Sequence, residues 1–172
     1  MSKKLLLLVP LAVGVAISIG MSTPGSVGPP WISLEMPANP LDPETRDAVL
    51  VVRAYHHATP AGYSLAGTAE GVVNGERRTI ELDLTSTSRP GVYALAQQWP
   101  SEGNWILAIA IEGRADGSLL VELGSDGGVS HDKFYDLTTR VVSVRSVRAV
   151  PGALGKKEIE TALRSMAEPT ED

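Results

Sequence analysis

The chain has 172 residues, no cysteine, and 15 basic against 20 acidic residues, for a formal net charge of −5. This acidic balance argues against nucleic acid as a partner, because binding to a phosphate backbone needs clustered Lys and Arg. The lack of cysteine excludes disulfides and a thioether-linked lipid, so a domain of this size must be stabilised by its hydrophobic core alone.

The N-terminus has the pattern of an export signal. Two lysines precede an uninterrupted apolar run at residues 5–19, and small residues at its end suit cleavage before Met21. The run, at about 15 residues, is shorter than the roughly 20 residues of a membrane-spanning helix. We therefore expect residues 1–20 to be a signal peptide of a periplasmic or extracellular protein. The alternative is an uncleaved segment, in which residues 5–20 anchor the protein to the inner membrane as its only membrane contact.

A linker and two strands are predicted next. Residues 21–30 are rich in Ser, Thr, Pro and Gly and are expected to form a flexible linker, because they cannot bury a core. A domain is predicted at 31–150, and its first strand at 31–36, where apolar and polar residues alternate. A central strand is predicted at 48–57, since the consecutive apolar residues at 49–52 are typical of a strand covered on both faces.

A hairpin is predicted in the middle of the chain. Its strands are expected at 65–73 and 77–84, and Asn74-Gly75 between them suits a two-residue type I′ turn because both residues tolerate positive φ. The second strand alternates between apolar and polar residues. One face of that strand should therefore be buried and the other exposed to water.

Further short strands are predicted at 92–98, 104–112, 118–123 and 140–150, separated by turns rich in Gly and Pro. In the strand at 104–112 every second residue from Trp105 onward is apolar, so Trp105 is expected in the core. About seven to eight short strands with regular turn signals indicate a mainly β chain. The predicted fold is an immunoglobulin-like antiparallel β-sandwich.

The last segment, 151–172, is predicted to contain a short amphipathic helix and a tail. Apolar residues recur with helical spacing at Ile159, Ala162, Leu163 and Met166. A helix of about three turns is marginal alone, so its apolar stripe must dock on another surface. That surface belongs either to its own domain or to a partner.

One stretch of the domain resembles a known family. Gly91 and Tyr93 form a Gly-x-Tyr strand, and Gly103 and Trp105 open a Gly-x-Trp-x-Leu strand that alternates. This pattern, within residues 48–113, resembles exported immunoglobulin-like domains of the YtkA and FixH type. The resemblance implies a small periplasmic or membrane-anchored module and not an enzyme. Some members of that family are connected with copper handling or oxidase assembly.

Copper would require imidazole or thioether ligands, and the candidates are His56, His57, Met36 and His131. Adjacent residues of a strand point to opposite faces, but His56 and His57 lie at a strand end beside a loop, where the two rings can converge. Two interpretations stay open. The histidines are either solvent-exposed residues at a strand end or the ligands of a copper-binding chaperone.

Catalytic motifs are weak. Residues 62–66 imitate the Gly-x-Ser-x-Gly nucleophile elbow, but they lead into a predicted strand and not into a helix. His131-Asp132 offers suitable residue types without a scaffold that would assemble them. Neither a phosphate-binding loop nor a dinucleotide fingerprint is present in the sequence. We therefore expect no enzyme and no cofactor.

The function that this sequence favours is a non-catalytic exported module that binds a protein partner or supports a complex in the cell envelope. Interfaces favour exposed aromatic residues. Trp99 precedes a proline at the end of a predicted strand, and it is the expected partner contact. The alternative is a periplasmic copper-binding chaperone that uses His56 and His57.

Overall fold

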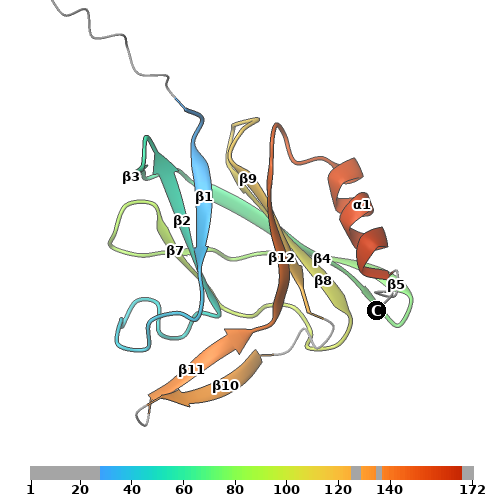
Figure 1. Cartoon of the computed structure of the whole chain (residues 1–172), viewed down its shortest axis with the longest axis horizontal. Coiled ribbons are helices and arrows are strands. Elements are labelled where there is room, and N and C mark those ends of the chain that lie inside the picture. Colours follow the sequence, from blue (N-terminus) through green and yellow to red (C-terminus); the bar gives the residue numbers. More distant parts are fainter. Residues whose placement is uncertain (1–27, 125–128, 135–136, 168–172) are drawn as a thin grey trace, which may run out of the picture.

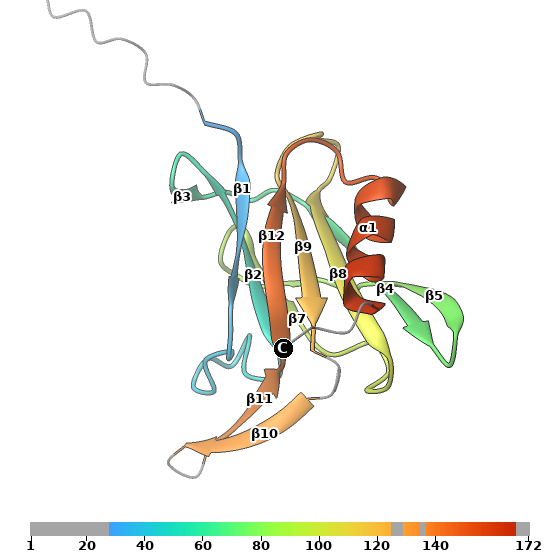
Figure 2. The same cartoon turned by 45° about the vertical axis from the view of Figure 1, so that its right-hand side comes forward.

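The protein is mainly β, with two antiparallel sheets packed together and one C-terminal helix (Figures 1 and 2). The computed structural model describes residues 28–124, 129–134 and 137–167. The predicted signal or anchor at 1–20 and most of the predicted linker at 21–30 lie outside the described residues. Within the described part of the chain, no helix has the length and apolarity needed to cross a membrane.

The first sheet has five strands, all paired antiparallel. The strands, in spatial order, are β1 (Trp31–Glu35), β2 (Leu50–His56), β7 (Val92–Leu95) and β6 (Thr85–Ser86), with β3 (Thr59–Pro60) beside β2. The short strand β3 pairs with the last two residues of β2, and β7 pairs with the first four.

The second sheet also has five antiparallel strands, and a separate two-stranded hairpin lies in the chain before the last strand of this sheet. The hairpin projects from one end of the sandwich, and β1 begins at the opposite end (Figures 1 and 2). The sheet consists, in order, of β12 (Val144–Val150), β9 (Ser118–Leu123), β8 (Asn104–Ile111), β4 (Leu65–Val73) and β5 (Glu76–Glu81), and the hairpin of β10 (Val129–Phe134) and β11 (Leu137–Val142).

The core lies between the two sheets. Trp105 is fully buried there, as predicted, and its indole N–H donates to the carbonyl of Glu102 at 2.9 Å. Gly71 on β4 lies directly opposite Trp105, and a Cβ at Gly71 would come within 2.4 Å of the indole ring. A glycine is therefore required where the ring crosses the strand. Other core residues are Leu50, Val52, Leu95, Leu107, Ile109, Val121 and Leu123.

The C-terminal helix α1 (Lys156–Ala167) packs on the outer face of the second sheet, over β8 and β9. Its buried residues are Ala162, Leu163 and Met166, which contact a second apolar cluster that includes Ile106 and Leu120 of the sheet. The helix predicted from its apolar spacing is confirmed, and it docks on its own domain.

The Asn74-Gly75 turn is confirmed, with positive φ at both residues. The strand predicted at 77–84 ends earlier, at Glu81, and the one predicted at 92–98 ends at Leu95. Beyond them the two segments are joined by the Gln98 side chain, which accepts from the N–H of Asp83 and donates to its carbonyl. Here the Gln98 side chain, and not a backbone group of a neighbouring strand, satisfies the backbone N–H and carbonyl of Asp83.

The prediction of one strand at 140–150 is wrong. The chain changes partner at Ser143, because β11 pairs with β10 and β12 pairs with β9. The carbonyl of Ser143 accepts a hydrogen bond from the N–H of Gly124 at this point. The two-residue strands β3 and β6 were also not predicted, because so short a segment carries no periodicity. The six-residue strand β10 was not predicted because its apolar residues do not alternate with polar ones.

Candidate functional site

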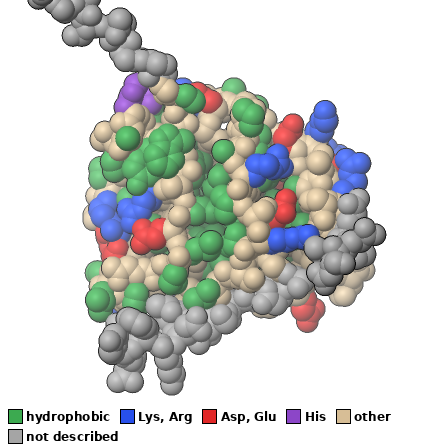
Figure 3. All heavy atoms as spheres, viewed as in Figure 1, with side chains coloured by type: hydrophobic (Ala, Val, Ile, Leu, Met, Phe, Trp, Pro, Cys, Tyr) green, Lys and Arg blue, Asp and Glu red, His purple; other side chains and the backbone are tan. Residues whose placement is uncertain are grey.

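A group of ring side chains lies at the end of the first sheet, near residue 28. We call it the aromatic–histidine cluster, and it consists of two groups that meet at neighbouring positions of β2: the stacked pair Trp31 and Tyr55, and the group of His56, His57 and Tyr63. Figure 3 shows histidine side chains at this end of the molecule, with a hydrophobic patch next to them. The cluster includes the two histidines to which the sequence pointed.

The Trp31–Tyr55 pair is built by strand register. β1 and β2 run antiparallel with Trp31 directly opposite Tyr55, which places both rings on the same face of the sheet. The rings stack with centroids 4.3 Å apart and planes 10° from parallel. Trp31 nevertheless remains 45% exposed. The stack fixes the orientation of a large aromatic surface that faces solvent.

The two histidines converge because β2 ends between them. His57 and Ala58 form the two-residue turn from β2 to β3, with φ values of 52° and 60°. The rings of His56 and His57 lie with centroids 4.1 Å apart and planes inclined by 54°. Positive φ costs a non-glycine residue roughly 1–2 kcal/mol. Neither histidine nor alanine is a preferred residue for such a turn.

Tyr63 connects the histidines to a charged pair. The Tyr63 ring meets that of His56 nearly edge-on, with centroids 6.2 Å apart. The Arg114 guanidinium lies over Tyr63 at 5.9 Å from the ring centroid. Its Nε and Nη2 atoms donate to the two carboxylate oxygens of Asp116 at 2.8 and 3.2 Å. The hydrogen bond from Arg114 lowers the pKa of Asp116 and raises that of Arg114.

Met36 and His131 are separated from the histidine pair. Met36 follows the end of β1 that pairs with Val51, so a strand rise of about 3.4 Å per residue puts it on the order of 20 Å from His56. His131 on β10 pairs with Arg140, and the Arg140 side chain bonds the carbonyl of Asp47, which precedes β2. Both residues thus belong to the opposite end of β2.

The four-residue ligand set expected from the sequence is therefore reduced to His56 and His57. Among the described residues, no three His, Cys, Asp or Glu side chains lie close enough together to hold a metal ion. Two imidazoles are the ligands that the structure places side by side.

The expectation that Trp99 is an exposed contact is wrong. Trp99 is 3% exposed and belongs to the core between the sheets. After β7 ends, the Gln97 side chain donates to the carbonyl of Trp99 at 3.0 Å, and the Trp99 ring packs in the core. Of the three tryptophans, the exposed one is Trp31, at the first position of β1. Sequence reasoning missed it because alternation assigns a strand's faces without showing how far each end is covered.

Comparison with protein-family models, with curated protein sequences and with solved structures finds no match to this chain.

Proposed function

We propose that this protein is a non-catalytic, exported β-sandwich module that binds a protein partner in the cell envelope through the aromatic–histidine cluster. The observation that carries the proposal is the stacked Trp31–Tyr55 pair, whose tryptophan is 45% exposed. Aromatic residues held in one orientation lose little conformational entropy on binding and dominate the energetics of many interfaces.

The strained turn at His57 and Ala58 supports the same surface. Non-glycine residues with positive φ are concentrated at functional sites, where the surrounding structure holds them. Here the rings of His57 and Tyr63 both lie next to the ring of His56, and His56 directly follows Tyr55 of the stacked pair in β2. The cluster therefore has a defined shape before any partner arrives, which lowers the cost of binding.

The location of the cluster fits an envelope role. β1 begins at this end of the sandwich (Figure 1), and Pro29 and Pro30 line a pocket together with Trp31, so the proposed signal or anchor precedes the cluster closely in the chain. A retained anchor would hold the cluster near the membrane and its resident proteins. The two packed antiparallel sheets agree in architecture with the YtkA- and FixH-type immunoglobulin-like domains that the sequence resembles. A likeness of fold alone does not assign a function, so the proposal depends on the cluster itself.

The experiment that tests this proposal is affinity capture of envelope proteins, with the protein as isolated after export and its Trp31→Ala, Tyr55→Ala double variant. Leu41→Ala is the matched control, because Leu41 is 74% exposed and lies away from the cluster. We expect the double variant to lose specific partners that wild type and the control retain. Identical sets of captured proteins from all three would overturn the proposal.

A second candidate function, a copper-binding chaperone, is favoured by the distance of 4.1 Å between the His56 and His57 ring centroids. Imidazole nitrogen is a common copper ligand, and two rings at this separation can bind one ion. Titration with Cu(I) and with Cu(II) tests it, in parallel on a His56→Ala, His57→Ala variant. Saturable binding of one equivalent that the variant loses would support the copper function, and equally weak binding by both proteins would exclude it.

A further inference from the structure

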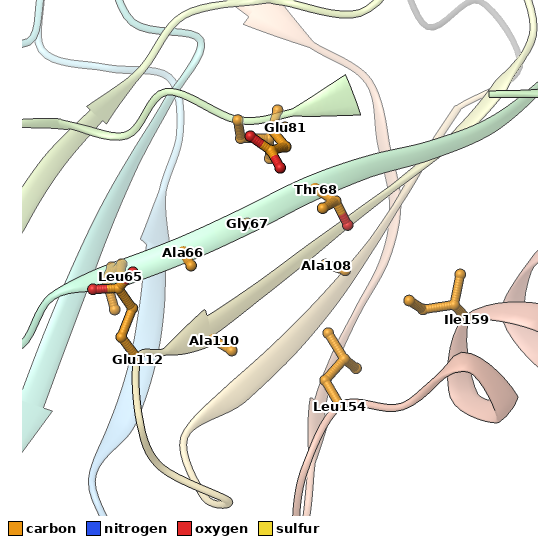
Figure 4. A pocket seen from close by; sticks show the side chains of 11 residues that line it. Leu65, Ala66, Gly67, Thr68, Glu81, Ala108, Ala110, Glu112, Leu154 and Ile159 are labelled. Carbon is orange, nitrogen blue, oxygen red and sulfur yellow. The ribbon is translucent and has the colours of Figure 1, made fainter. Parts of the chain in front are cut away.

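A groove of about 540 Å³ lies on the outer face of the second sheet, beside α1. The helix covers β8 and β9 but leaves much of β4 open, so the outer face is only partly covered. Figure 4 shows the groove with β4 and β8 as its floor, Glu81 of β5 on one side and α1 on the other.

The floor of the groove is made of small side chains, and its wall on the helix side is apolar. Ile159 extends toward the floor from α1, and Leu154 extends toward it from the segment that precedes the helix (Figure 4). Small residues on a packing surface allow another backbone to approach closely. The residues of the floor are Ala66, Gly67, Thr68, Ala108 and Ala110.

Two free carboxylates flank this apolar surface. Glu81 and Glu112 are exposed, and neither side chain takes part in an ion pair or hydrogen bond with another described residue. Glu70, on the same outer face, is by contrast bonded to Arg77 at 3.0 Å. None of the residues that line the groove is basic. The groove therefore presents uncompensated negative charge to whatever occupies it.

We propose that this groove is the docking site for an amphipathic helix of a partner protein that carries Lys or Arg beside its apolar stripe. A helix is about 10 Å wide, and a second helix beside α1 would complete the layer on this face of the sheet. Its apolar side chains would contact the floor and Ile159, and its cations would pair with Glu81 and Glu112.

A second copy of this chain is a poorer occupant. The helix of the described chain, α1, already buries its apolar residues against its own sheet. The chain also has a net charge of −5, so two copies repel each other. The groove and the aromatic–histidine cluster occupy different sheets, so this inference stands independently of the function proposed for the cluster.

The test measures fluorescence anisotropy of a labelled 18-residue amphipathic peptide of Leu, Ala and Lys, titrated with the protein as isolated after export. A peptide with Glu in place of every Lys is the control probe. We expect saturable binding of the lysine peptide and about tenfold weaker binding by a Glu81→Gln, Glu112→Gln variant, since two charge pairs are lost. Raising the salt concentration should reduce the difference between wild type and this variant.

Two further variants separate the groove from general charge attraction. Glu76→Gln, Glu102→Gln removes the same charge from exposed residues that do not line the groove and should bind like wild type. Ala66→Trp fills the groove at an exposed floor position and should abolish binding while the unfolding curve stays unchanged. Absent binding of the lysine peptide, or equal binding by wild type, the Glu81 and Glu112 variant and Ala66→Trp, would overturn the inference.

Discussion

Two hairpin turns in this protein both have positive φ at their two residues, but only one of them has a sequence that suits this conformation. Asn74 and Gly75 join β4 to β5 with φ values of 51° and 81°, and His57 and Ala58 join β2 to β3 with φ values of 52° and 60°. Asn-Gly is the preferred sequence for such a turn, whereas His-Ala lacks the glycine that adopts positive φ without steric cost. The strain thus lies in the candidate functional site and is absent from the purely structural hairpin, which is the distribution expected where function has constrained residue identity.

The largest expected effect comes from placing strain in the structural turn. Gly75→Val puts a β-branched residue at positive φ, and a Cβ at this position would meet open space. The backbone conformation alone should therefore lower the free energy of unfolding, by about 2 kcal/mol. Urea denaturation of the two proteins measures it. An unchanged midpoint would show that this turn adapts, and that the comparison between the turns has no energetic basis.

Removing strain from the turn in the site should have the opposite sign. Ala58→Gly relieves the positive φ at Ala58, and we expect it to raise the free energy of unfolding by about 1 kcal/mol. Thermal unfolding monitored by circular dichroism provides the measurement. The matched control is Ala66→Gly, at an exposed strand position, which should destabilise by about 0.5–1 kcal/mol instead. Destabilisation by both glycines would contradict the assignment of strain to Ala58.

A smaller gain is expected from His57→Asn, about 0.5 kcal/mol, because the short polar side chain of asparagine can hydrogen-bond locally in the left-handed region. The substitution also removes one ring from the aromatic–histidine cluster. If His57 is kept for function, the more stable variant should bind the partner or copper more weakly than wild type. Unfolding curves check the expected gain in stability, and the copper titration on the same preparation checks the expected loss of binding. Greater stability with undiminished binding would leave the strain without a functional reason.

The smallest effect concerns the charged pair next to the cluster. Because Arg114 lowers the pKa of Asp116, the folded state gains stability from the ionised carboxylate above the ordinary aspartate pKa of about 4, and this gain is lost as the pH falls below it. Asp116→Asn should therefore show a shallower loss of stability between pH 5 and pH 3 than wild type does. Urea midpoints at several pH values measure it, and parallel curves for the two proteins would refute the coupling.

Elements encoded by neighbouring residues could be predicted from the sequence. Asn74-Gly75, the buried face that contains Trp105 and the apolar spacing of α1 each depend on short-range pattern, and all three are confirmed. Trp99 is buried in an irregular segment beyond β7, where glutamine side chains bond the backbone, and the break at Ser143 depends on which strand each half pairs with. Composition does not encode either feature.

The candidate site was predicted only in part, for the same reason. His56 and His57 were recognised as a pair at a strand end, and their convergence follows from a two-residue turn whose sequence gives no turn signal. The Trp31–Tyr55 stack requires the register between two strands that are separated by a long loop. Alternation within each strand shows which residues share a face but not which residue of another strand lies opposite.

The three tryptophans of this protein are intrinsic fluorescence probes that lie in two different environments. Trp99 and Trp105 are sealed in the core, so their emission should respond to unfolding and remain insensitive to acrylamide in the native state. Trp31 lies in the surface cluster and is the tryptophan that a soluble quencher can reach. Protection of this quenchable fraction on mixing would reveal, without any label, the moment at which a ligand covers the cluster.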